Sequence, residues 1–102
     1  MAREQSDVCW KVPLPAVEKL VLMYLATHAA KATACARPSW AQLSLYTGQD
    51  IEALKAILLG FEQRRFLVRE RREKQSTLYF LQMGELERAA VEVPKAEARA
   101  HG

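Results

Sequence analysis

Cysteine and histidine are scarce in this sequence, whose 102 residues include two of each. Cys9 and Cys35 have no C-x-x-C spacing and no nearby histidine ligands, which indicates two free thiols in a reducing, cytoplasmic setting. His28 and His101 are the only histidines that could act in catalysis, and the sequence contains no nucleophile motif to accompany them. We therefore expect a protein that is not an enzyme and that uses no metal and no other cofactor.

Long apolar stretches are also missing. The longest, residues 20–26, is much shorter than the roughly 18–20 residues that cross a bilayer, so no membrane-spanning segment is expected. The first seven residues lead into no apolar signal core, so we do not expect secretion. Half of the residues are hydrophobic and 26% are charged, which is ordinary for a globular protein with one core and one domain.

Positive charge is concentrated in one short part of the chain. The net charge is +3 at pH 7, but residues 63–81 carry six basic and two acidic side chains, whereas residues 38–62 carry one basic and three acidic ones. The basic members of the first stretch are Arg64, Arg65, Arg69, Arg71, Arg72 and Lys74. Such a cluster is typical of a phosphate-binding surface, and the alternative is a solvated strand that binds nothing.

Three helices are predicted in the first two thirds of the chain. Apolar residues spaced three and four apart predict one from about residue 15 to 30, with His28 hydrogen-bonded to a carbonyl at its end. Ser39 can cap a short second helix over residues 40–46, Gly48 can end it, and Asp50 can cap a third that runs to about residue 65. The side chains expected to face the core are Val17, Leu20, Val21, Tyr24, Leu25, His28, Trp40, Leu43, Tyr46, Leu54, Ile57, Leu58 and Phe61.

The segments around these helices carry weaker signals. Alternation of Val8, Trp10 and Val12 predicts a short strand or an anchoring arm, with the tryptophan in the core or over it. Residues 31–37 are expected to form a connection without regular structure. Residues 84–91 are expected to form a short final helix.

A two-stranded hairpin is predicted after the third helix. Residues 66–72 and 77–81 have strand character, and residues 73–76 are expected to form the turn between them. Side chains alternate along a strand. Those of the second strand that should face the core are Thr77, Tyr79 and Leu81.

The opposite side of that strand is apolar as well. Leu78 and Phe80 point there, where a monomer normally has polar residues. We expect either residues 84–91 or a second copy of the chain to cover them, with Leu59 of the third helix as a further contact. These three residues are therefore the candidates for a homodimer or partner interface.

Four short motifs occur in a fixed order along the chain. Residues 19–28 read KLVLMYLATH, residues 38–43 read PSWAQL, residues 47–48 read TG and residues 61–67 read FEQRRFL. In this order they resemble the winged helix-turn-helix domains of phage and plasmid replication initiators and related transcription regulators. That family shows Leu-Ala-x-His, Pro-Ser, Thr-Gly and Leu-Glu-x-x-Gly-Leu at the corresponding places.

The resemblance implies a fold and a domain organisation. The fold is mainly α with a small β-hairpin (α+β), built from three helices and a two-stranded wing. The winged helix-turn-helix domain covers residues 14–81, after an N-terminal arm at 1–13 and before a C-terminal helix and flexible tail at 82–102. The implied function is that of a small DNA-binding protein, a transcription regulator or replication accessory of mobile-element type, which acts as a homodimer on double-stranded DNA.

The resemblance also implies which residues contact DNA. They lie in the second helix, in the turn, in the third helix and in the wing: Ser39, Gln42, Gln49, Glu52, Lys55, Arg69, Arg71, Arg72 and Lys74. The outward side of the third helix departs from the family, because Lys55 is its one cation and Glu52 repels phosphate. This surface favours an alternative function, a winged helix that docks another protein through Glu52, Ala56 and Leu59 instead of DNA.

Overall fold

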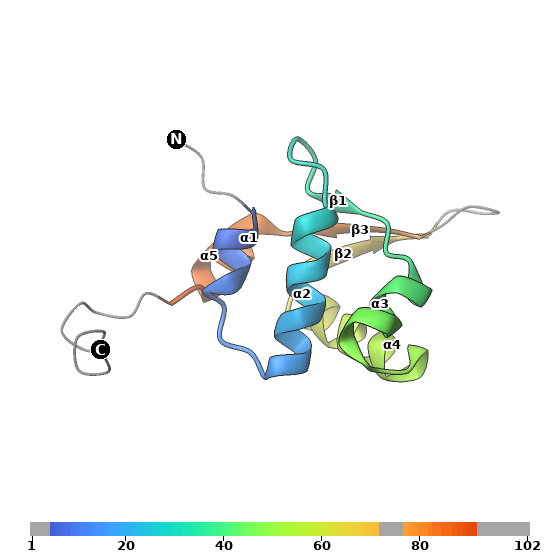
Figure 1. The fold of residues 1–102 in the computed structure, drawn as a ribbon. Coiled ribbons are helices and arrows are strands. Elements are labelled where there is room, and N and C mark those ends of the chain that lie inside the picture. The colour runs from blue at the N-terminus through green and yellow to red at the C-terminus, as the bar shows by residue number, and fades with distance from the viewer. Residues whose placement is uncertain (1–4, 72–76, 92–102) are drawn as a thin grey trace, which may run out of the picture.

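Five helices and a three-stranded antiparallel sheet form the protein over residues 5–71 and 77–91, which are the residues that this computed structural model describes (Figure 1). The α+β class predicted from the sequence is confirmed. The elements in chain order are α1 (Gln5–Trp10), α2 (Ala16–His28), β1 (Cys35–Ala36), α3 (Trp40–Thr47), α4 (Ile51–Gln63), β2 (Leu67–Glu70), β3 (Leu78–Leu81) and α5 (Met83–Ala89). The turn and the tail predicted at 73–76 and beyond residue 91, with Arg72 and Lys74, lie outside the described residues.

Helix α1 replaces the strand or arm expected at the start of the chain. Val8, Cys9 and Val12 are fully buried, whereas Trp10 is 64% exposed and so lies neither in the core nor over it. Val8 and Val12 are four residues apart, a spacing that places side chains on one face of a helical turn. The Lys19 amine donates to the carbonyls of Trp10 and Val12 and thereby satisfies acceptors at the end of α1.

Helix α2 lies at the centre of the molecule and has the predicted position. It contacts α1, α3, α4 and β1. Its buried residues are Val21, Leu22, Leu25 and Ala26, so Leu22 faces inward. Leu20 and His28, both expected to face the core, are exposed. The buried face of α2 differs from the predicted one because α1, which was not predicted from the sequence, covers part of this helix.

The turn between α3 and α4 follows the predicted capping chemistry. The Ser39 hydroxyl accepts a hydrogen bond from the Gln42 backbone N–H at 3.3 Å, and the Asp50 carboxylate accepts one from the Ala53 N–H at 2.8 Å. Gly48 has φ +73° at the end of α3, the left-handed conformation that glycine adopts without strain. These three local predictions are confirmed.

The inward faces of α3 and α4 are those predicted, with one exception. Leu54, Leu58 and Phe61 of α4 and Leu43 of α3 are buried. Tyr46, which was expected inside, is exposed, and its ring stands 6.5 Å from that of Tyr24 at the surface. In this short helix Leu43 is fully buried, and Trp40 packs partly against the core.

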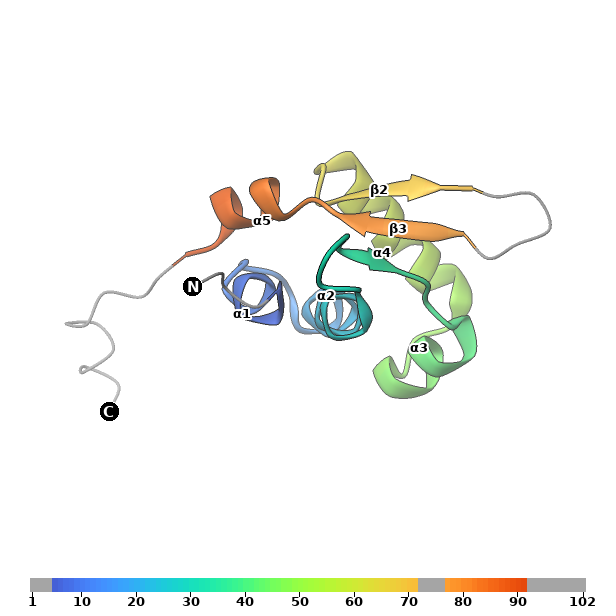
Figure 2. The same ribbon diagram turned by 90° about the horizontal axis from the view of Figure 1, so that it is seen from above.

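The sheet has the strand order β1-β3-β2, with both pairings antiparallel. Strand β1 lies in the segment expected to be a plain connection; Cys35 pairs with Phe80 and Ala36 with Tyr79. The hairpin of β2 and β3 reaches toward the α3–α4 end of the molecule, and α1 and α5 lie at the other end (Figure 2). This arrangement leaves α4 and the hairpin next to each other.

Strand β3 shows the predicted alternation. Tyr79 and Leu81 are buried, and Leu78 and Phe80 are partly exposed on the opposite face. Helix α5 forms where a final helix was predicted, but it packs against α1. The two side chains therefore keep part of their surface in solvent over the described part of the chain.

None of the helices in the described ranges combines the length and the apolar character needed to cross a membrane.

Candidate nucleic-acid interface

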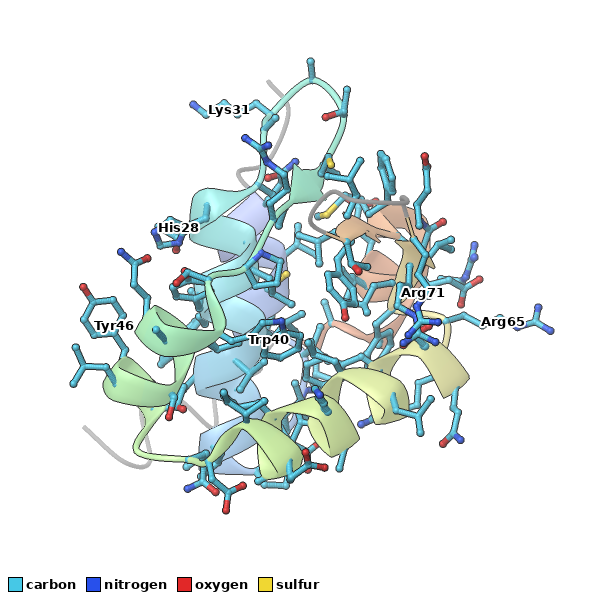
Figure 3. The ribbon with its side chains drawn as sticks, turned by 90° about the vertical axis from the view of Figure 1, so that its right-hand side faces the viewer. His28, Lys31, Trp40, Tyr46, Arg65 and Arg71 are labelled. Carbon is cyan, nitrogen blue, oxygen red and sulfur yellow. The ribbon has the colours of Figure 1, made fainter. Side chains whose placement is uncertain are left out.

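A groove of about 390 Å³ lies between the outward side of α4 and the hairpin of β2 and β3, and we call it the α4–hairpin groove. Figure 3 looks onto this end of the molecule, with Trp40 between α3 and the strands and Arg71 above α4. The residues that line the groove are Trp40, Lys55, Leu58, Leu59, Glu62, Arg69, Arg71, Thr77 and Tyr79. Residues from α3, α4 and both hairpin strands therefore meet in one place.

Three cations of the predicted site meet in this groove. Lys55 comes from the exposed side of α4, and Arg69 comes from β2, where it pairs across the sheet with Tyr79. Arg71 follows two residues later, so strand alternation turns it to the same face as Arg69. Among the ion pairs of the described residues, neither Lys55 nor Arg71 takes part.

One carboxylate also lines the groove. The Oε1 atom of Glu62 lies 3.4 Å from the Nε atom of Arg69. The Glu62 side chain is 20% exposed and that of Arg69 is 41% exposed, so solvent weakens but does not remove their attraction. Sequence reasoning missed Glu62 as a site residue, although it follows Lys55 by seven residues, two turns along the same side of α4.

Tyr79 places its hydroxyl among these charges. Burial raises the pKa of Tyr79 above the ordinary tyrosine value; the Arg69 guanidinium opposes that shift and the Glu62 carboxylate adds to it. The hydroxyl therefore stays protonated at neutral pH and is available as a neutral donor. Together with Trp40, which packs partly against the core, it was not predicted as part of the site.

The other predicted DNA contacts that the structure describes lie outside the groove. The Ser39 hydroxyl caps α3, and the Gln42 side-chain oxygen accepts from the Tyr24 hydroxyl at 3.1 Å. Gln49 is partly buried in the turn between α3 and α4, and Glu52 is exposed on the first turn of α4. The structure thus brings together Lys55, Arg69 and Arg71, but it does not place these four residues with them.

The basic cluster of the sequence divides in space. Arg64 lies over the Phe66 ring, 4.8 Å from its centroid, and its guanidinium is 3.9 Å from the Glu18 carboxylate on α2. Arg65 stands where the family pattern has glycine and has φ +64°, a conformation that is strained for a residue with a side chain. Neither residue lines the groove, so two of the six basic residues are used at the end of α4 instead.

His28 has the structural role expected from its position. Its Nδ1 atom hydrogen-bonds the Tyr24 carbonyl oxygen at 2.9 Å, and its ring stacks on the Tyr24 ring with centroids 4.3 Å apart. The prediction that His28 bonds a carbonyl at the helix end is confirmed.

Both cysteines are free thiols, as predicted. Burial raises the pKa of the Cys9 thiol to about 11, although the Lys19 ammonium opposes the shift. This thiol is therefore protonated and unreactive at neutral pH. Over residues 5–71 and 77–91, no three histidine, cysteine, aspartate or glutamate side chains gather in a way that could hold a metal ion.

The three candidate interface residues lie on two different surfaces. Leu59 is 50% exposed and lines the α4–hairpin groove on the inner side of the sheet. Leu78 and Phe80 lie on the outer side of β3. One partner surface therefore cannot cover all three in the way the sequence suggested.

The α4–hairpin groove has the chemistry of an anion site. It joins two guanidinium groups, one ammonium group and a neutral hydroxyl donor, against a single carboxylate among the described lining residues. Comparison with protein-family models, with curated proteins and with solved structures finds no match for this chain.

Proposed function

We propose that the protein binds double-stranded DNA as a winged helix-turn-helix domain and that the α4–hairpin groove binds the phosphate backbone. The observation that carries the proposal is the convergence of Lys55, Arg69 and Arg71 on one groove from two different elements. Cations that neutralise phosphates release condensed counterions from DNA, which supplies most of the affinity of such contacts. The protein acts in transcription or in replication of a mobile element, in the cytoplasm.

The topology supports the finer assignment of the fold. Helices α2, α3 and α4 follow one another with a tight turn between the last two, and the hairpin of β2 and β3 comes next. In this assignment α4 is the recognition helix and the hairpin is the wing. Strand β1 extends the expected two-stranded wing to three strands by pairing with β3, and α1 and α5 are additions at the far end.

The outward side of α4 favours backbone contact over base reading. Glu52, Ala56, Leu59 and Gln63 are exposed there, and Lys55 is the cation among them. Leucine and alanine offer no hydrogen bond to base edges, and glutamate repels phosphate. We therefore expect binding that depends strongly on salt and weakly on DNA sequence.

The test is a salt titration of binding to a fluorescently labelled duplex of random sequence. Arg71→Ala and Lys55→Ala should each flatten the plot of log affinity against log salt by about 0.9, because each removes one phosphate contact. Arg88→Ala is the matched control, since it removes one positive charge from α5 at the other end of the molecule. An unchanged slope in both groove variants, or wild-type protein that does not bind at low salt, contradicts the proposal.

A second candidate function rests on the same exposed side of α4. Leu59 is half exposed and stands near Ala56 and Glu52, a surface that suits docking of another protein. In that case duplex binding is absent at low salt, and Leu59→Lys abolishes capture of the partner. The DNA titration therefore decides between the two.

A further inference from the structure

Phosphate binding does not explain why Glu62 lies in the groove. Among the described residues that line the groove it is the one acid, and it is less exposed than the arginine beside it. It also stands on the same side of α4 as Lys55, two turns further along, so the carboxylate faces the groove in which the lysine would meet phosphate. A carboxylate in a phosphate site repels the ligand unless a neighbouring cation neutralises it.

Arg69 is that neighbouring cation. The contact of 3.4 Å runs from the Glu62 carboxylate to Nε of Arg69, and both side chains line the groove. The two opposite charges largely cancel for a phosphate that lies farther from the pair than the 3.4 Å between them. The groove then offers an incoming phosphate the charges of Lys55 and Arg71, which form no ion pair with another described residue.

We propose that Glu62 competes with DNA phosphate for Arg69 and thereby limits the affinity of the groove. The inference rests on the proposed function, because it takes DNA phosphate as the ligand. In the free protein Arg69 is held by Glu62 and adds little to binding. Removal of the carboxylate makes Arg69 a third phosphate contact.

The central experiment is the salt titration with Glu62→Gln, which keeps the size of the side chain and removes its charge. The slope of log affinity against log salt should steepen by about 0.9. If the variant and the wild type bind equally well at 1 M salt, the variant should then bind about fivefold more tightly than the wild type at 0.15 M. Glu70→Gln is the matched control: Glu70 pairs with Leu78 across the sheet and so lies on the opposite face. It makes the same change in net charge and should leave the slope nearly unchanged.

The competition itself is tested by combining Glu62→Gln with Arg69→Gln. Arg69→Gln alone should change the slope much less than Arg71→Ala does, because Glu62 already occupies Arg69. In the Arg69→Gln background the Glu62 carboxylate is no longer neutralised, so Glu62→Gln should raise the affinity by removing repulsion. It should steepen the slope much less than it does with Arg69 present, since no guanidinium remains to form a further phosphate contact. Thermal melting of each variant checks that the fold is retained.

A spectroscopic readout does not depend on affinity. The Arg69 Nε–H resonance of the wild-type protein should move little on addition of duplex, and that of the Glu62→Gln variant should move clearly. Weaker or unchanged binding by Glu62→Gln, or an equal steepening of the slope with and without Arg69, overturns the inference while Arg71→Ala still shows that the groove binds DNA. If Arg71→Ala and Lys55→Ala both leave the slope unchanged, the proposed function fails as well.

Discussion

The two faces of the three-stranded sheet are built from the same strands and yet meet different surroundings. The row of paired residues on the inner face consists of Ala36, Tyr79 and Arg69, and the row on the outer face consists of Cys35, Phe80 and Val68. The inner row passes from the core to the charged groove, because β1 contacts α2 and β2 contacts α4. The outer row is apolar, and Val68 in it is 53% exposed.

This difference shows what strand alternation determines and what it does not. Alternation assigned Tyr79 and Leu81 to one face and Leu78 and Phe80 to the other, and the structure agrees. It could not say which elements cover each face, because that depends on helices distant in sequence. The apolar outer face is the part of the molecule that a second copy of the chain would cover.

The largest expected effect is a loss of stability on the inner face. Leu81→Ala should lower the free energy of unfolding by roughly 2–5 kcal/mol, because Leu81 is buried and the change leaves a cavity. Phe80→Ala, one position away on the outer face, should cost about 1 kcal/mol, since its side chain is partly exposed. Urea unfolding of both variants gives the comparison, and equal losses would mean that the outer face is packed as tightly as the inner one.

A change of oligomeric state is the next effect in size. If two copies of the chain join through the outer face, the double variant Leu78→Lys with Phe80→Thr should sediment as a monomer where the wild type sediments as a dimer. The control is Leu59→Lys, which puts the same charge on the other side of the sheet and should leave sedimentation unchanged. Identical sedimentation of the double variant and the wild type contradicts dimerisation through this face.

The parts of the fold that sequence reasoning predicted well depend on chemistry within a few residues. The caps at Ser39 and Asp50 and the left-handed Gly48 each need one side chain and the next turn of backbone. Helix α1 was missed because Val8 and Val12 fit a strand with period two as well as a helix with spacing four. Strand β1 has two residues and exists through its pairing with β3, so no local pattern marks it.

The candidate site was predictable to a similar extent. The basic residues of the hairpin and the single lysine of α4 were identified, and the structure brings Lys55, Arg69 and Arg71 to one groove. The separation of Arg64 from this group was not predictable, because it follows from contacts with α2 and with the Phe66 ring. The approach of Glu62 to Arg69 likewise depends on how closely β2 lies along α4.

The two cysteines offer a smaller effect that reports on the outer face. At pH 8 a thiol-specific reagent should label Cys35 in the native protein and Cys9 after unfolding, because Cys35 is partly exposed and Cys9 is fully buried with a pKa of about 11. The Cys35→Ser variant should lose the fast labelling of the native protein, which assigns that reaction to Cys35. If a second copy covers the outer face, Leu78→Lys with Phe80→Thr should speed labelling of Cys35, whereas an unchanged rate would contradict that cover. Equal rates for the two thiols would place Cys9 outside the core.

The smallest effect concerns the hydroxyl on the inner face. Tyr79→Phe keeps the buried ring and removes the group that faces Arg69, so the free energy of unfolding at pH 7 should fall by about 1 kcal/mol. Burial raises the pKa of Tyr79 in the folded protein, so its contribution is fully present below the ordinary tyrosine value of about 10 and is lost as pH rises through the folded pKa. The wild type should therefore lose stability above about pH 10 more steeply than the variant does. If the free energies of unfolding of the two proteins fall in parallel as pH rises, the hydroxyl is as well solvated in the folded state as in the unfolded chain. The groove would then contain more water than the burial of Tyr79 indicates.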